Sequence, residues 1–271
     1  MGDNSETKRL HIATLGSSFA AGPGIPPQIS RMAGRSGNNY AHLLAARLDA
    51  DLTDLTVSGA TLNNILSEPQ QAYRWSTSFP PQITGLPADA DIVTVTGGGN
   101  DMGYIGGVSR EALKDTWLGY VLSWLIPTPP SDPLTAEAVA KRFTLVVDEI
   151  QKIAPKARIL LVEYFCLLGP DTRPGIDVNL TEEQIKRHQG VAEQVKTAYR
   201  LVAEARPGCE VIPVDERSRA HALGSKEPWI EGFSWGTVWQ GNPFHPNLKG
   251  MQGVADMIYE KLKDDGVVSS A

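Results

Sequence analysis

The stretch DIVTVTGGG, residues 91–99, decides the fold class. Its residues before the glycines are apolar or β-branched almost without a break, which is typical of a strand buried on both faces. Such strands occur in parallel sheets, because crossover helices cover both sides of the sheet. The stretch therefore predicts an interior strand of a parallel α/β sheet, with three glycines at its carboxyl end.

Apolar runs on both sides of this stretch alternate with helical patterns. Four more strands are expected at residues 10–16, 52–59, 158–165 and 210–215, and helices at residues 39–48, 136–154, 181–205 and 247–263. The helix after Thr181 opens with a capping-box pattern, since Gln184 follows three residues later. This alternation predicts a three-layer α/β/α sandwich around five parallel strands. Because no linker or internal repeat interrupts it, we expect residues 1–271 to form a single domain.

Two segments do not fit the alternation. Residues 103–135 and 218–244 each follow an expected strand, and they contain Trp117, Trp124, Trp229, Trp235 and Trp239. Sites in parallel sheets lie beyond the carboxyl ends of the strands, so both segments are candidate pocket walls. The alternative is that they are surface loops that bury their tryptophans in a satellite cluster. The polar residues 1–8 are expected to be a flexible N-terminus.

Composition excludes several classes of protein. The chain has 271 residues, 41% of them hydrophobic, and a net charge of −6, which argues against nucleic acid or an anionic membrane as its partner. The sequence shows no transmembrane segment and no signal peptide, so a cytoplasmic location is expected, although a secreted form without its leader would look the same. Cys166 and Cys209 lack metal or redox spacing and are expected to be buried free thiols, with a disulfide as the alternative.

Residues able to carry out acyl transfer follow three expected strands and precede the last helix. Ser18 follows the first strand, Gly59 the second and Asn100 the third, and His245 comes just before the final helix. In a parallel sheet these places meet at one edge, which would bring a nucleophile, a base and oxyanion donors together. Each residue alone has a structural explanation, such as a helix cap or a turn glycine. The scattered histidines and the missing phosphate loop predict neither a metal nor a cofactor.

These four blocks resemble the SGNH hydrolase superfamily of GDSL esterases and lipases, from residue 10 to about residue 263. The resemblance implies a flavodoxin-like sheet with strand order 2-1-3-4-5. It implies Ser18 as nucleophile, the backbone N–H groups of Ser18 and Gly59 with the Asn100 side chain as oxyanion hole, and His245 as general base. The implied activity is hydrolysis of carboxylic esters through an acyl-enzyme.

The chain departs from the family pattern at two positions. Ser17 stands where the family has the aspartate before its nucleophile, and Asn242 stands where it has the aspartate three residues before the histidine. An amide cannot offset an imidazolium charge, but some members of the superfamily use a backbone carbonyl to orient the ring. We therefore expect the carbonyl oxygen of Asn242 to hold Nδ1 of His245, with the Asn242 side chain or Asp215 as alternatives.

The sequence does not identify the ester. The tryptophan-rich segments fit a small-molecule substrate that is partly apolar or aromatic, and acetyl, long-chain acyl, aryl and sugar esters all stay open. An inactive binding protein on the same fold is one alternative, which Asn242 keeps open. Acyl transfer from the same site is another, and a flavodoxin-like nucleotide- or flavin-binding protein is a third. The oligomeric state cannot be read from the sequence.

Overall fold

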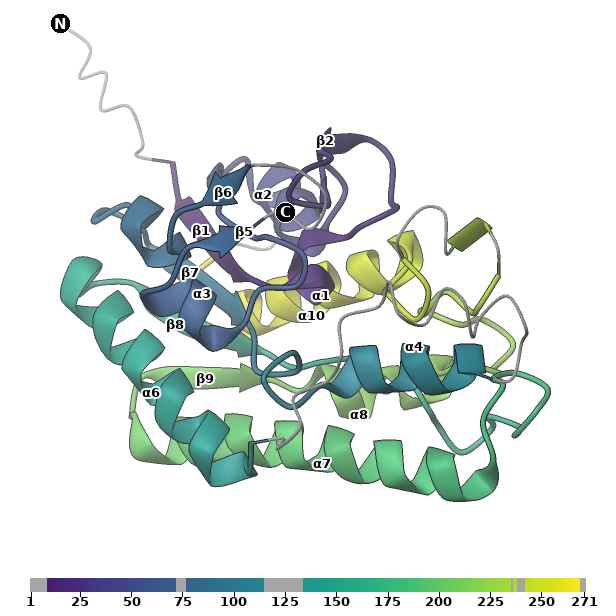
Figure 1. The fold of residues 1–271 in the computed structure, drawn as a ribbon. Coiled ribbons are helices and arrows are strands. Elements are labelled where there is room, and N and C mark those ends of the chain that lie inside the picture. The colour runs from purple at the N-terminus through teal and green to yellow at the C-terminus, as the bar shows by residue number, and fades with distance from the viewer. Residues whose placement is uncertain (1–8, 72–76, 115–133, 235, 238–241, 269–271) are drawn as a thin grey trace, which may run out of the picture.

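The computed structural model describes residues 9–71, 77–114, 134–234, 236–237 and 242–268. Its centre is a sheet in which every pair of neighbouring strands is parallel. The strands stand in the order β4 (Asp51–Asp54), β1 (His11–Gly16), β7 (Ile92–Thr96), β8 (Arg158–Val162) and β9 (Cys209–Ile212) (Figure 1). In chain order this arrangement is 2-1-3-4-5, which confirms the expected flavodoxin-like sheet.

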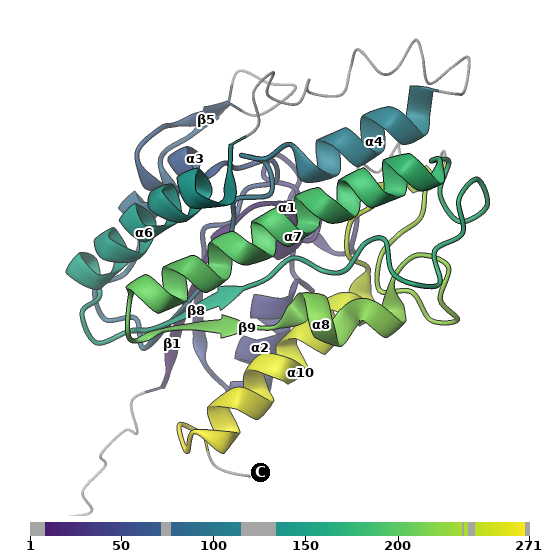
Figure 2. The same ribbon diagram turned by 90° about the horizontal axis from the view of Figure 1, so that it is seen from below.

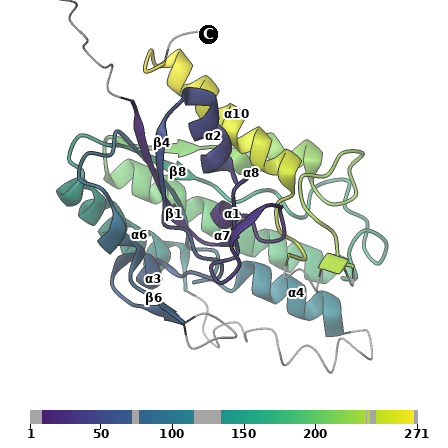
Figure 3. The same ribbon diagram turned by 90° about the horizontal axis from the view of Figure 1, so that it is seen from above.

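Helices cover both faces of the sheet (Figures 2 and 3). On one face α6 (Ala136–Ile153) packs against α7 (Glu182–Ala205), with the short α3 (Leu62–Leu66) beside α6. On the other face α2 (Tyr40–Leu48) packs against α10 (Leu248–Asp264). The three-layer sandwich is therefore confirmed.

Strand β7 lies inside the sheet, as its sequence predicts, and all five of its residues are buried. Its threonines satisfy their hydroxyl groups within the core. The Oγ1 of Thr94 donates to the Oγ1 of Thr14 at 2.8 Å, and the hydroxyl of Tyr40, on α2, lies 3.1 Å from the Oγ1 of Thr96. Because these polar atoms bond to one another, the core can hold them without the penalty of an unpaired buried group.

The second strand is shorter than residues 52–59, and this expectation was wrong at its carboxyl end. Asp54 Oδ1 accepts hydrogen bonds from the backbone N–H of Thr56 at 2.9 Å and from its hydroxyl at 2.7 Å. Such local bonds make the strand irregular beyond Asp54, although the N–H groups of Leu55 and Val57 still donate to carbonyl oxygens of β1 at 2.9 and 3.1 Å. The sequence also did not predict several short elements, namely α1 (Ser18–Ala21), α4 (Tyr104–Lys114), α8 (Val214–Ser218), η1 (Gln82–Gly85), η3 (Arg219–His221), the hairpin of β2 (Gln28–Ser30) and β3 (Arg35–Ser36), and the hairpin of β5 (Gln70–Gln71) and β6 (Ser78–Phe79).

Some expectations fall on residues outside those that the structure describes. They are the expectation of a flexible N-terminus at residues 1–8, the part of the first candidate pocket wall at 115–133, and the placement of Trp117, Trp124, Trp235 and Trp239. Cys166 and Cys209 are free thiols, as expected, but only Cys209 is buried, whereas Cys166 is partly exposed. Within the described residues, no helix is long and apolar enough to cross a membrane.

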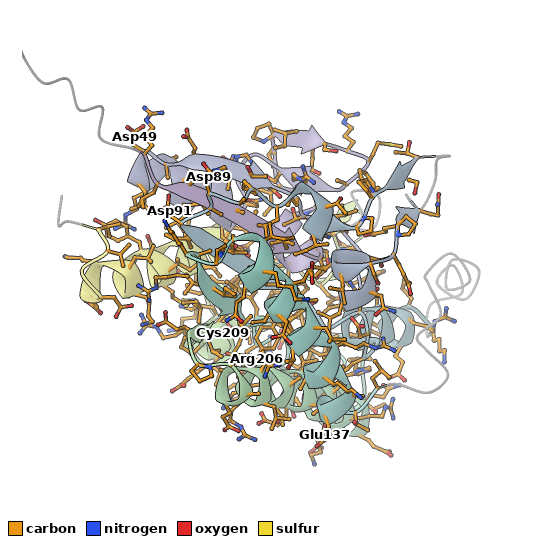
Figure 4. All side chains as sticks on the ribbon, turned by 90° about the vertical axis from the view of Figure 1, so that its left-hand side faces the viewer. Asp49, Asp89, Asp91, Glu137, Arg206 and Cys209 are labelled. Atoms are coloured by element: carbon orange, nitrogen blue, oxygen red, sulfur yellow. The ribbon has the colours of Figure 1, made fainter. Side chains whose placement is uncertain are left out.

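The two ends of the strands differ in what they carry. Figure 4 faces the amino ends, where Asp49 and Asp91 precede strands and Cys209 begins one. The loops with the candidate catalytic residues leave the opposite, carboxyl ends. The two ends therefore divide structural from functional positions, as is usual in parallel α/β folds.

Glu163, directly after β8, is a buried carboxylate whose titration should be visible in stability. Its only hydrogen bond among the described residues comes from the backbone N–H of Asp215 at 3.3 Å, and burial raises its pKa to about 7. At pH values between the ordinary pKa of a glutamate and about 7, the folded protein binds more protons than the unfolded chain. The stability of the fold therefore falls as the pH rises through this range.

We expect Glu163→Gln to remove this cost. The variant should match the wild type near pH 4, below the ordinary pKa of a glutamate, and exceed it by roughly 3 kcal/mol at pH 8, from the size of the pKa shift. Urea unfolding at the two pH values measures the difference. Equal stability of both proteins at pH 8 would contradict the raised pKa.

Candidate active site

The turn between β1 and α1 presents Ser18 while holding Ser17 in the core. An added Cβ on Gly16 would lie 2.5 Å from the carbonyl oxygen of Thr96, so only glycine fits at this point. The N–H of Ser17 donates to the same Thr96 oxygen at 2.9 Å, and the Ser17 hydroxyl lies 2.8 Å from that of Tyr164. The Ser18 hydroxyl has no hydrogen-bond partner among the described residues. Of the two adjacent serines, Ser18 is therefore the one available to react.

The loops after β4 and β7 place two further donors near this turn. Gly59 has a φ of +85°, a left-handed conformation that favours glycine, and its N–H has no acceptor among the described residues. The Asn100 side chain donates one N–H to the carbonyl oxygen of Ala60 at 2.8 Å, which leaves its second N–H free. Asp101 ties the same two loops together by accepting from the N–H of Leu62 at 3.0 Å. Asp101 therefore braces the turn that carries Asn100 against the start of α3.

Tyr164, which follows β8, joins the serine turn to the Asn100 loop. Its hydroxyl contacts Ser17 and also accepts from the N–H of Gly99 at 3.3 Å. An added Cβ on Gly99 would lie 2.6 Å from the tyrosine ring, so the glycine lets the ring approach the loop. One buried side chain thus fixes the residue before Ser18 and the residue before Asn100. The sequence did not single out Tyr164.

We expect Tyr164→Phe to lower kcat by roughly tenfold and to change KM little. The variant keeps the ring but leaves the Ser17 hydroxyl and the Gly99 N–H without a partner, at a cost of about 1–3 kcal/mol for such a buried group. Steady-state kinetics with an activated ester, together with urea unfolding, separates positioning from stability. A kcat equal to that of the wild type would show that the hydroxyl positions nothing.

His245 is presented on a β-bulge. The N–H of Glu231 donates to the carbonyl oxygen of His245 at 2.8 Å, and the N–H of Phe244 donates to that of Glu231 at 2.9 Å, so two residues face one. Phe244 has a φ of +61°, which is rare for a bulky residue. Bulges of this kind re-aim side chains beside functional sites.

The ring of His245 is oriented by a backbone carbonyl. Its Nδ1 lies 2.9 Å from the carbonyl oxygen of Pro243. A carbonyl can only accept, so the proton sits on Nδ1 and Nε2 is left as an acceptor. Removal of the ring from water lowers the pKa of His245 to about 4, although the bond to Pro243 acts in the opposite direction.

We expected the backbone carbonyl of Asn242 to orient the ring. This expectation is wrong, because the carbonyl that accepts from Nδ1 belongs to Pro243. The Asn242 carbonyl accepts instead from the backbone N–H of His245 at 3.2 Å. The Asn242 side chain packs on Gly24, where an added Cβ would lie 2.2 Å from its Nδ2. Asp215 faces Lys196 at 3.5 Å and Arg219 at 3.3 Å and makes no bond to the imidazole. A backbone carbonyl of any residue offers the same acceptor, so the sequence could not choose between neighbours.

Phe19, the residue after Ser18, packs beside the imidazole of His245. The ring of Phe19 lies 5.5 Å from the imidazole and 4.7 Å from the ring of Tyr164, measured between centroids. No hydrogen bond joins the Ser18 hydroxyl to the imidazole in the described part of the chain; such bonds often tighten only when substrate is bound. The same part of the chain holds no cluster of three or more potential metal ligands.

Comparison with known proteins places this geometry in a family. The model of the GDSL-like lipase/acylhydrolase family matches residues 14–252, and the chain therefore belongs to that family. It is 26% identical to Lipase 2 of Streptomyces coelicolor, over 94% of this chain and 87% of that protein.

Solved structures with the same fold include two from Streptomyces. Phospholipase A1 from Streptomyces albidoflavus NA297 superposes with a TM-score of 0.71 at 18% identity, covering 94% of this chain and 100% of that one. An extracellular lipase from Streptomyces rimosus gives a TM-score of 0.68 at 19% identity, covering 93% and 99%. At these identities the likeness shows the SGNH hydrolase fold alone.

Proposed function

We propose that the protein is a serine esterase that hydrolyses carboxylic esters through an acyl-enzyme on Ser18. The observation that carries the proposal is the bond between Nδ1 of His245 and the Pro243 carbonyl, which leaves Nε2 as the acceptor for a hydroxyl proton. The same bond supports an esterase over an inactive binding protein, because the carbonyl orients the imidazole as the missing aspartate would.

In this mechanism His245 takes the proton of Ser18 as its oxygen attacks the acyl carbonyl. The backbone N–H groups of Ser18 and Gly59 and the free amide N–H of Asn100 stabilise the oxyanion, and His245 then gives the proton to the leaving alcohol. Water next attacks the acyl-enzyme with His245 again as base, which releases the acid and restores Ser18.

The test uses p-nitrophenyl esters from acetate to palmitate together with an alkyl fluorophosphonate. We expect turnover of at least part of the series, and one phosphonyl group per chain on the peptide that carries Ser18, located by mass spectrometry. Turnover without labelling, or labelling of another serine, would refute the assignment. The chain-length optimum would give the size of the acyl pocket.

A further inference from the structure

A cleft of about 320 Å³ lies between two loops that come from distant parts of the chain, and its lining includes Asn242 and Asn247, which stand on either side of His245 in the sequence. One wall is the loop after α1, with Gly24, Ile25 and Pro26. The other wall comes from the segment before His245 and from the start of α10. Its lining residues include Glu231, Thr237, Asn242 and Leu248.

Glu231 is fixed against the catalytic histidine and carries an unpaired charge. Its backbone makes the two bulge hydrogen bonds to Phe244 and His245, at 2.9 and 2.8 Å. Its carboxylate makes no hydrogen bond or ion pair with any other described residue. None of the residues that line the cleft is basic. The carboxylate is therefore the single charged group that the lining residues offer to a ligand.

The other residues that line the cleft are compatible with a cation whose charge is surrounded by alkyl groups. Ile25, Pro26 and Leu248 supply apolar surface, and Leu248 is 40% exposed. The hydroxyl of Thr237 already bonds within its own loop. Asn242 is buried, and its Oδ1 has no donor among the described residues. An unpaired carboxylate beside low-dielectric walls attracts positive charge more strongly than it would in open water.

The position of the cleft assigns it to one side of the ester. His245 gives its proton to the leaving alcohol, so groups that flank the imidazole face the alcohol part of the substrate. None of Ser18, Gly59, Asn100 and His245 lines the cleft itself. The cleft adjoins the histidine segment through Asn242, Asn247 and the backbone bond from Glu231 to His245, and no lining residue comes from the loops of Gly59 and Asn100.

We propose that this cleft binds the alcohol part of the substrate and that Glu231 selects alcohols with a positive charge, such as quaternary or alkylated amino alcohols. The inference rests on the proposed ester hydrolysis. It names a substrate class that the family assignment does not supply.

The test compares two esters of the same acid that differ only in charge, a choline ester and its carbon isostere, the 3,3-dimethylbutyl ester. At low salt the wild type should show kcat/KM roughly tenfold higher for the choline ester, about 1.4 kcal/mol of preference. The preference should shrink at high salt because screening weakens the attraction. Glu231→Gln should bring the ratio of the two esters near one.

Glu216→Gln is the matched control, since Glu216 is an exposed carboxylate on α8 outside the cleft and the net charge changes equally. It should keep the wild-type ratio. A wild-type ratio near one, or a preference that survives in Glu231→Gln, overturns the inference while the ester hydrolysis stands. If neither ester is hydrolysed, the proposed function fails instead. Calorimetric binding of choline against 3,3-dimethylbutanol then decides the role of Glu231 without turnover.

Discussion

Ser18→Ala should abolish ester hydrolysis, lowering kcat by roughly 10⁴- to 10⁶-fold, as loss of the nucleophile does in other serine hydrolases. The reason is that the remaining groups can bind and polarise the ester but offer no atom that forms the acyl-enzyme. The variant should fold normally, because the Ser18 hydroxyl makes no hydrogen bond to any other described residue. The measurement is hydrolysis of the best p-nitrophenyl ester, with circular dichroism to verify the fold.

Ser17→Ala is the control that makes this result specific. Its hydroxyl bonds to Tyr164 in the core, so its loss removes a positioning contact but no reacting atom. We expect it to retain activity within roughly tenfold of the wild type, a loss comparable to one buried hydrogen bond. Should Ser17→Ala be the inactive variant and Ser18→Ala the active one, the nucleophile is misassigned.

The second large effect concerns His245 and pH. His245→Ala should lose roughly 10⁴- to 10⁶-fold in kcat, because the variant has no base for the serine proton. In the wild type the base works only as neutral imidazole. Its lowered pKa means that the neutral form persists to low pH, so kcat/KM should fall only as pH drops through about 4, far below the ordinary midpoint near 6.5.

The pH profile needs two controls. Circular dichroism across pH 3.5–8 must show that the protein stays folded, since unfolding would also end activity. His11→Gln changes a histidine at the amino end of β1, at the end of the sheet opposite the candidate site. This variant should leave the pH profile unchanged. An acid limb with its midpoint near 6.5 would mean that the imidazole is solvated or is paired with a carboxylate.

The sheet could be predicted because burial on both faces leaves a signature in sequence. Residues 91–99 show it directly, and the alternation with amphipathic helices fixes parallel pairing. The early end of the second strand could not be seen. There the Asp54 carboxylate accepts hydrogen bonds from the N–H and the hydroxyl of Thr56, and the apolar pattern of residues 52–59 is the same with or without these bonds.

The candidate site residues could be predicted where the proposed chemistry needs a particular side chain. They could not be predicted where any residue type would serve. Ser18, Gly59, Asn100 and His245 each stand at a strand end or before a helix in a pattern that the family shares. Pro243 acts through its backbone, which every residue has. Tyr164 resembles any buried aromatic, and Glu231 any solvated carboxylate on a loop. Their roles come from contacts with segments far away in the chain.

The contact between Gly24 and Asn242 has a consequence for how this protein can change during evolution. The two residues are 218 positions apart by their numbering, yet the amide fills the space that a side chain at position 24 would need. A larger residue at position 24 would displace the segment that carries His245. A substitution at one of the two positions can therefore be tolerated only if the residue at the other becomes smaller or moves. The two loops must change together. Relatives with another substrate preference should differ at both places together.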